Sequence, residues 1–274
     1  YGECVILAGG AASGKGFIQD KIDMTGKVFD VDELKKKYQK MAKAGIFQDD
    51  KEYDLTKPED VAELHQKVKD TGMKSKERSK FWKQRSRGNE EHSSGLLPNV
   101  IFDMVSDNIK DIEEVVTMAK ANGYHVTLVW VVCNKDTAIM NNAVRGIDKA
   151  DKARKVPDEV LENGHNGAYK TITELLSNKY PTLNEFIDIA WYGFSAGWGR
   201  MLDSKYEKNM VYKVKKNNNK FSFNQNEIDE FLKVQQPINY DVDDKLNTSL
   251  ASFRDGKKGE WGVKKYEYFK EFNK

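Results

Sequence analysis

The feature that most constrains the fold is a glycine-rich turn near the N-terminus. Residues 9–15 read Gly-Gly-Ala-Ala-Ser-Gly-Lys and fit the pattern G-x-x-x-x-G-K. An apolar run, 3–8, precedes the turn and predicts a strand, and a helical pattern follows it from Lys15 to Ile22. Glycines let the backbone curl so that successive N–H groups point at a phosphate chain, to which the helix N-terminus adds its dipole. The sequence therefore predicts a strand, a phosphate-binding loop (P-loop) and a helix.

A nucleoside triphosphate, ATP or GTP, is the expected ligand of this loop, with the Lys15 ammonium on the β- and γ-phosphates. The expected nucleotide-binding residues are Gly9, Gly10, Ala11, Ala12, Ser13, Gly14, Lys15, Gly16 and Phe17. A glycine-rich surface turn followed by a solvated lysine is the alternative interpretation.

The residue after the lysine is Gly16, where the usual loop has Ser or Thr to hold Mg²⁺. Two acids can replace that ligand. Asp103 ends the apolar strand Val100–Asp103 in the manner of a Walker B aspartate, and Asp30 ends the second predicted strand. A degenerate loop that binds a nucleotide without turning it over is the alternative.

Strand and helix patterns alternate along most of the chain. Apolar runs predict strands at 3–8, 27–31, 99–103, 124–133 and 186–194, and a hairpin from 210–214 and 221–223. Helical spacing predicts helices at 15–22, 32–44, 58–70, 75–86, 109–121, 136–144 and 157–176. Alternation of this kind implies a parallel sheet covered on both faces. The predicted fold class is α/β: a three-layer P-loop fold with a mainly parallel five-stranded sheet and a small C-terminal extension.

Composition limits the partners and the compartment. The 274 residues carry 45 Lys and Arg against 43 Asp and Glu, so a generic nucleic-acid coat is excluded and any basic function must be local. The longest apolar run, His125–Cys133, is less than half of the roughly 20 residues that span a bilayer, so no membrane helix is expected. Cys4 and Cys133, the two cysteines, both lie in apolar strands. We therefore expect reduced thiols and a cytoplasmic location.

Asp30 and Asp32 flank the end of the second predicted strand, at the edge where open α/β sheets bind ligands. Strand alternation would turn both side chains to one side, and Asp32 also stands where a helix N-cap is expected. Beside a phosphate loop, the interpretation of Asp32 as a general base for a hydroxyl is the better one.

Arg145 and Arg154 bracket a charged stretch between two predicted helices. Such a segment can fold over a bound nucleotide, and its arginines would then neutralise charge on the transferred phosphoryl group. A solvated helical hairpin is the alternative.

Four separated segments together resemble the zeta-toxin family of P-loop kinases. They are Ile6–Lys15, Phe29–Leu34, Asn99–Asp103, and Arg145 with Arg154–Pro157. The resemblance implies an ATP-dependent kinase with an alcohol acceptor. It implies that Asp32 activates the acceptor hydroxyl, that Asp103 is the acid of the third strand, and that both arginines contact the ATP phosphates.

The residues after Asp103 depart from the family pattern. Met104-Val105 replace its usual glycine-threonine, so the acceptor-facing hydroxyl is missing unless Ser106 supplies it. Zeta-toxin relatives phosphorylate nucleotide sugars such as UDP-N-acetylglucosamine, while looser cousins phosphorylate polynucleotide ends, antibiotics or hydroxymethylated bases.

A basic segment with aromatic residues, Lys74–Arg87, bears on the choice of acceptor. It holds seven basic residues against one acid, with Phe81 and Trp82 between them, a composition suited to single-stranded nucleic acid. Arg78, Trp82 and Arg85 are therefore predicted acceptor contacts. A second lysine cluster, 205–220, could line the same groove. A solvated basic helix anchored to the core by its aromatics is the alternative.

The sequence thus predicts a kinase with ATP (or GTP) and Mg²⁺ as cofactors and a nucleic-acid hydroxyl, either a polynucleotide end or a hydroxymethylated DNA base, as the preferred acceptor. A nucleotide-sugar kinase and a catalytically silent nucleotide- or nucleic-acid-binding module are the alternatives. The expected division is a kinase domain over 1–200, with a basic helical insertion at about 50–95, and an extension over 201–274 packed on the same domain. The spacing of the four histidines and two cysteines matches no zinc site.

Overall fold

The computed structural model describes residues 2–21, 26–55, 57–91, 99–145, 156–195 and 211–233, all within one compact unit, Tyr1–Val234. The second unit, Gln235–Lys274, lies outside the described residues. The strands are β1 (Glu3–Ala8), β2 (Lys27–Asp30), β3 (Val100–Met104), β4 (His125–Cys133), β5 (Ile189–Ser195), β6 (Val211–Asn217) and β7 (Lys220–Ser222). The helices are α1 (Lys15–Lys21), α2 (Val31–Lys43), α3 (Pro58–Asp70), α4 (Met73–Glu91), α5 (Ile109–Ala121), α6 (Lys135–Arg145), α7 (Asp158–Leu176), α8 (Pro181–Phe186) and α9 (Gln225–Lys233).

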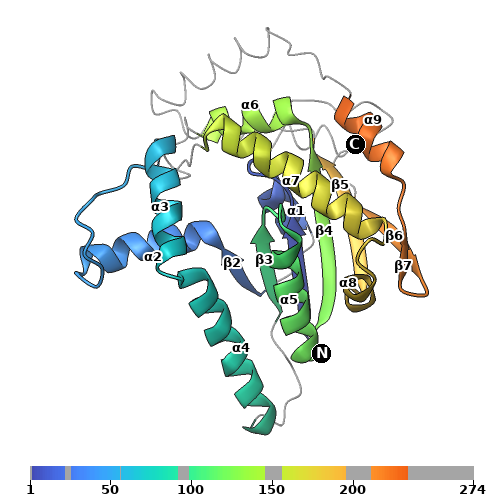
Figure 1. Ribbon diagram of the computed structural model, residues 1–274, viewed down its shortest axis with the longest axis horizontal. Coiled ribbons are helices and arrows are strands. Elements are labelled where there is room, and N and C mark those ends of the chain that lie inside the picture. The colour runs from blue at the N-terminus through green and yellow to red at the C-terminus, as the bar shows by residue number, and fades with distance from the viewer. Residues whose placement is uncertain are drawn as a thin grey trace. The chain divides into compact units, whose positions relative to one another are not determined.

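The strands form one mixed sheet in the order β2-β3-β1-β4-β5-β6-β7 (Figure 1). The first five strands in that order run parallel. Strand β6 pairs antiparallel with β5, and β7 pairs antiparallel with β6. The predicted α/β class and the mainly parallel sheet are confirmed. Among the described residues the sheet has seven strands rather than the five predicted, because the hairpin β6–β7 pairs with β5 and extends the sheet.

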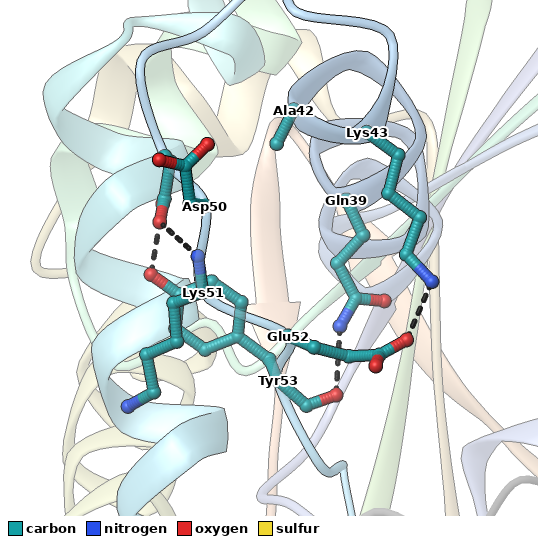
Figure 2. Close-up of a pocket in the computed structure, with 8 residues that line it drawn as sticks. Gln39, Ala42, Lys43, Asp50, Lys51, Glu52 and Tyr53 are labelled. Carbon is teal, nitrogen blue, oxygen red and sulfur yellow. Dashed lines mark hydrogen bonds and ion pairs between the residues drawn. The ribbon is translucent and has the colours of Figure 1, made fainter.

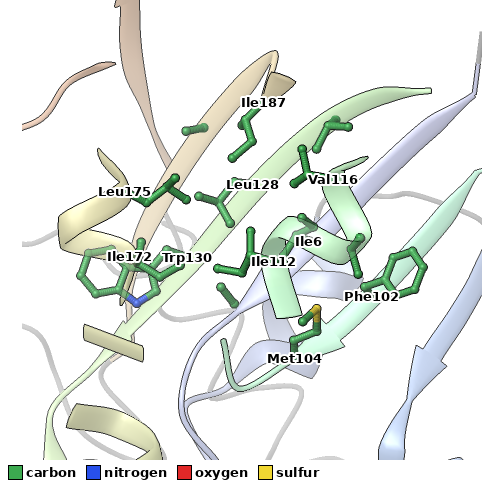
Figure 3. Packing of buried hydrophobic residues seen from close by; sticks show 14 of the residues in the cluster. Ile6, Phe102, Met104, Ile112, Val116, Leu128, Trp130, Ile172, Leu175 and Ile187 are labelled. Carbon is green, nitrogen blue, oxygen red and sulfur yellow. The ribbon is translucent and has the colours of Figure 1, made fainter. Parts of the chain in front are cut away.

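Both faces of β1, the middle one of the five parallel strands, are covered, which explains its uninterrupted apolar run. Ile6 of β1 packs with Phe102 and Leu128 under α5, α7 and α8, and this larger core layer is drawn in Figure 3. Val5 and Leu7 face the other side and pack with Ile18 of α1. Every residue from Cys4 to Ala8 is buried, as expected for a parallel strand between two helical layers.

The C-terminal part of the described chain joins the same core. Phe221 of β7 and Phe231 of α9 belong to the cluster that contains Ile6. Tyr192 of β5 donates its hydroxyl to Glu227 of α9 at 2.8 Å, which holds that helix beside the sheet. The division of the chain at residue 200 stays a prediction.

One predicted strand begins later than expected. The run 186–194 was predicted as strand, but Phe186 ends α8 and β5 starts at Ile189. Pro181 at the first position of α8 presets a helical backbone, so one helical turn forms before the strand. No helix in the described part of the chain is long and apolar enough to cross a membrane.

Candidate active site

The loop between β1 and α1 has the backbone of a phosphate-binding turn. Gly9 and Gly14 adopt positive φ angles of 151° and 91°, which L-residues rarely adopt. A Cβ at Gly9 would also lie 2.9 Å from the Val131 carbonyl oxygen of β4. Ala12 is left-handed too, at φ 58°. The loop therefore depends on glycine at two positions and stores strain at a third, as functional turns do.

Lys15 lies inside the curl of this loop. Its Nζ donates to the carbonyl oxygens of Gly9 at 2.7 Å and Gly10 at 3.0 Å, and lies 3.5 Å from Oδ1 of Asp103. Only 12% of the lysine side chain is exposed. A cation is thus fixed at the C-terminal edge of the sheet, where phosphates bind in this class of fold.

The predicted metal ligands lie on neighbouring strands. Asp30 and Asp103 are in register on the parallel strands β2 and β3, and Leu7 is in register with Asp103 on β1. Residues in register point to the same face, so Asp103 shares the α1 face with Leu7 and Lys15. Two carboxylates and an ammonium group therefore meet beside the loop.

Asp32 is placed differently from the sequence prediction. The strand ends at Asp30, which is the N-cap of α2: its Oδ1 accepts the Asp32 backbone N–H at 2.8 Å. Asp32 is therefore neither the cap nor a strand neighbour of Asp30, but a residue of the first turn of α2. Its Oδ1 lies 3.1 Å from Nζ of Lys35. An Asx cap one residue before the helix explains the shift, because it ends the strand earlier.

Lys35 is an unusual partner for a surface carboxylate because it is buried, with a side chain only 8% exposed. Burial lowers the pKa of its ammonium group, and the charge of Asp30 opposes that shift. The neighbouring pair on the same helix, Glu33 with Lys36, is more exposed at 62% and 29%. The Asp32–Lys35 pair is thus the one turned toward the protein.

Mg²⁺ prefers oxygen ligands and keeps several waters, so two carboxylates plus phosphate oxygens suit it. Asp103 is 25% exposed and accessible to an ion. One oxygen of Asp30 is engaged as the helix cap. Among the described residues no three His, Cys, Asp or Glu side chains gather as a ligand cluster. The donor set therefore fits magnesium held jointly with a nucleotide.

Replacing Gly16 with serine is expected to lower the Mg²⁺ concentration needed for half-maximal nucleotide turnover several-fold. A Cβ at Gly16 meets no atom within 4 Å, so the side chain fits, and it supplies the hydroxyl that usual P-loops carry. Gly16→Ala is the matched control, since both substitutions raise helix propensity, by about 0.5 kcal/mol for serine and about 1 kcal/mol for alanine, but alanine adds no oxygen. Magnesium titrations of turnover that coincide for the two variants would contradict the prediction.

Ser106 follows β3 in a strained position. It is 2% exposed with φ 61°, and its Oγ has no hydrogen-bond partner among the described residues. The residues after β3 pack closely against α7. A Cβ at Gly167 would lie 2.6 Å from Asp107 Cβ, and the Thr171 hydroxyl donates to the Asp107 carbonyl oxygen at 3.1 Å. An unpaired buried hydroxyl on a strained backbone is typical of a ligand-binding position.

Two polar side chains missed by the sequence analysis contact the loop from helices α6 and α7. Nε2 of His165 lies 2.7 Å from the Ala11 carbonyl oxygen, and Nδ2 of Asn141 donates to the Ala12 carbonyl oxygen at 2.9 Å. No motif marks either residue, because each lies more than a hundred positions from the loop.

Several predicted site residues lie partly or wholly outside the described residues. Arg145 ends α6, so its backbone lies on the helix that contacts the loop through Asn141, but its side chain is outside the described residues, as are those of Phe17 and Arg85. Arg154 and residues 205–210 of the second lysine cluster also lie outside them, whereas the remaining lysines of that cluster lie on β6 and β7.

Two of the predicted acceptor contacts in the basic-aromatic segment, Trp82 and Arg78, are buried rather than at the surface. Trp82 is 4% exposed, with its ring 6.0 Å from that of Phe102 and 5.7 Å from that of Tyr124. Arg78 is 5% exposed and binds Glu114 of α5 at 3.0 Å. Both side chains attach α4 to the core: burial of its apolar ring stabilises Trp82 there, and the ion pair with Glu114 holds Arg78. The charged residues of α4 that do face solvent include Lys76, Lys80 and Lys83.

A hollow of about 360 Å³ lies elsewhere, between the last turns of α2 and residues 49–53 (Figure 2). Asp49 is the centre of its hydrogen bonds and accepts the hydroxyls of Tyr38 at 2.8 Å and Tyr53 at 2.9 Å. The lining residue Gln39 is seven positions along α2 from Asp32, or roughly 10 Å at 1.5 Å per residue. This hollow is thus separate from the phosphate loop, and its contacts hold a loop onto α2.

Comparisons with known proteins show similarity in part of the sequence and in the fold. The zeta toxin family model matches residues 91–220, a little under half of the chain, which includes Asp103 and Ser106. The structure of the AvrRxo1-ORF1:AvrRxo1-ORF2 complex with ATP is similar, with a TM-score of 0.53, 15% identity, and coverage of 86% of this chain and 65% of that one. The same complex with sulphate ions gives a TM-score of 0.52 at 15% identity and the same coverage.

A structure of the PezAT toxin-antitoxin system of Streptococcus pneumoniae has a TM-score of 0.47 at 13% identity and covers 92% of this chain and 85% of that one. This chain spans about 65% of the length of the AvrRxo1 chains it matches. No curated protein matches it in sequence.

The fold and the loop together define a P-loop α/β protein. Over residues 91–220 the chain is similar to the zeta toxin family, the same family that its motifs resemble.

Proposed function

We propose that this protein is an ATP-dependent kinase that transfers the γ-phosphoryl group to a hydroxyl of a nucleotide sugar such as UDP-N-acetylglucosamine. The observation that carries the proposal is the cluster at the edge of the sheet. Lys15 lies 3.5 Å from Asp103, and Asp30 is in register with Asp103 on the neighbouring strand. Asp32 lies in the first turn of α2, which follows Asp30. A cation for phosphate, oxygen ligands for Mg²⁺ and a candidate base are the parts that phosphoryl transfer needs.

In the proposed reaction the loop N–H groups and Lys15 hold the triphosphate. Asp32 accepts the proton of the acceptor hydroxyl. The hydroxyl oxygen then forms a bond to the γ-phosphorus, and the bond from that phosphorus to the β–γ bridging oxygen breaks, which releases ADP. Arg145 and Arg154 neutralise charge on the transferred group. Mg²⁺, held by Asp103 and Asp30 when bound, would offset the charge of the β- and γ-phosphates. Catalysis rests on positioning and charge stabilisation.

The choice of acceptor follows from where the aromatic and basic side chains lie. A polynucleotide groove needs stacking rings and cations at the surface, but Trp82 and Arg78 are buried. The match to the zeta toxin family supports the nucleotide sugar instead. Ser106, with its unpaired hydroxyl at the end of β3, is the residue we expect to contact the acceptor.

The test is a labelling experiment on a panel of acceptors. The protein is incubated with Mg²⁺ and γ-labelled ATP against UDP-N-acetylglucosamine, single-stranded DNA, RNA, and duplex DNA with and without hydroxymethylated bases. We expect label on the sugar nucleotide alone. Label on a polynucleotide would overturn the acceptor but keep the kinase. ATP binding with no label on any acceptor would support a catalytically silent nucleotide-binding module instead.

A further inference from the structure

His165 of α7 touches the phosphate loop through a single, well-defined hydrogen bond. Its Nε2 lies 2.7 Å from the carbonyl oxygen of Ala11. A carbonyl oxygen can only accept, so Nε2 carries the proton and donates it. Burial lowers the pKa of the ring, the charge of Lys15 lowers it further, and the bond to Ala11 opposes both. The ring is therefore a neutral donor held at the loop.

The ring also packs against the loop backbone. A Cβ at Gly10 would lie 2.3 Å from Cδ2 of His165, closer than any real contact allows. Gly10 does not have a positive φ, unlike Gly9 and Gly14, so its own backbone conformation does not require glycine. The close approach of His165 is what requires it. Gly10 and His165 thus fit each other as a pair.

Holding a carbonyl group fixes the N–H group that follows it. A trans peptide is planar, with its C=O and N–H pointing in opposite directions. The bond from His165 to Ala11 O therefore sets the direction of the Ala12 N–H. The Ser13 N–H is used inside the loop, where it donates to the Gly10 carbonyl oxygen at 3.3 Å, and the bond from Asn141 to Ala12 O holds that turn from the other side. His165 holds the Ala11 carbonyl oxygen toward α7, which directs the Ala12 N–H away from that helix.

We propose that His165 is a positioning residue for the phosphate loop: it orients the Ala12 N–H toward the nucleotide phosphates, while Asn141 braces the neighbouring peptide. The inference rests on the proposed function, in which this loop binds ATP. His165 does not touch the reacting atoms and acts through the peptide of Ala11. Because it shapes binding in the ground state and the transition state alike, its loss should raise KM for ATP more than it lowers kcat.

The test compares His165→Gln with His165→Leu. Glutamine places an amide donor near the position of Nε2, whereas leucine fills similar volume with no donor. We expect leucine to weaken binding of a non-hydrolysable ATP analogue about tenfold in calorimetry, the size of one lost hydrogen bond, and glutamine to remain within about threefold of the natural chain. Asn166→Ala, an exposed change one residue along α7, is the control and should bind normally.

Each outcome bears on the inference. Equal affinities for the leucine variant and the natural chain, with both folded by circular dichroism, would overturn it and leave the proposed function standing. Equal losses in the glutamine and leucine variants would also overturn it, because packing rather than the donor would then explain the effect. Failure of the natural chain to bind the analogue would reject the proposed function and the inference together.

Discussion

Replacing Lys15 with methionine is expected to lower kcat/KM for phosphoryl transfer by about 10²–10³-fold, the cost of losing one preorganised charge at the transferred group. Nζ of Lys15 is fixed by two loop carbonyl oxygens and lies 3.5 Å from Asp103, with 12% of the side chain exposed. Methionine matches the length of the aliphatic chain and removes the ammonium. The measurement is steady-state transfer from γ-labelled ATP to UDP-N-acetylglucosamine.

The fold should survive this change, because the apolar core around β1 does not depend on the lysine. Lys170→Met is the matched control, since Lys170 is an exposed lysine on α7 and its loss should leave transfer unchanged. Transfer by Lys15→Met within about threefold of the natural rate would contradict a phosphate role for this side chain. Such a result would return the loop to the alternative of a glycine-rich turn with a solvated lysine.

Local patterns explain why much of the fold could be predicted. The predicted helices at 58–70 and 109–121 coincide with α3 and α5, and the predicted strand at 3–8 coincides with β1. Each of these elements has strong periodicity or a complete apolar run bounded by turn residues. The P-loop was recognisable for the same reason, since its glycines and lysine are contiguous in the sequence.

The features that the sequence could not settle depend on contacts between distant segments. Whether Trp82 faces solvent or the core is decided by Phe102 and Tyr124, which lie on other elements. His165 and Asn141 reach the loop from 154 and 129 positions away. A single histidine on a helix gives no signal of such a contact, because its periodicity is that of any half-buried residue.

The displaced helix start at α2 shows a subtler limit. Both Asp30 and Asp32 are good caps by type, so composition could not choose between them. The choice is made by β2, which pairs with β3 only as far as Asp30 in register with Asp103. Where the sheet pairing ends, the Asp30 side chain accepts the Asp32 backbone N–H, and Asp32 enters the helix. The base assigned from the motif therefore lies on a rigid helical turn rather than on a strand.

The position of Asp32 in the first turn of α2 leads to the second prediction of a large effect on phosphoryl transfer. Replacing Asp32 with asparagine is expected to reduce phosphoryl transfer by about 10²–10⁴-fold, because an amide cannot accept the hydroxyl proton. ATP affinity is expected to stay within about twofold, because the loop and Lys15 are the groups that hold the triphosphate in the proposed reaction. The side chain is 35% exposed, so an acceptor can reach it. The measurements are single-turnover transfer to UDP-N-acetylglucosamine and calorimetry with a non-hydrolysable ATP analogue.

Glu33→Gln is a closely matched control for Asp32→Asn. Glu33 is the next residue on the same turn and forms the same kind of i,i+3 ion pair, with Lys36, but 62% of its side chain is exposed. Each substitution removes one carboxylate charge and one helical i,i+3 ion pair, and an exposed pair such as Glu33–Lys36 contributes only about 0.3–0.5 kcal/mol. A loss of transfer confined to Asp32→Asn would assign the proton to that carboxylate. Equal losses in both variants, or none in either, would remove Asp32 as the base and leave activation of the hydroxyl to another group at the edge of the sheet.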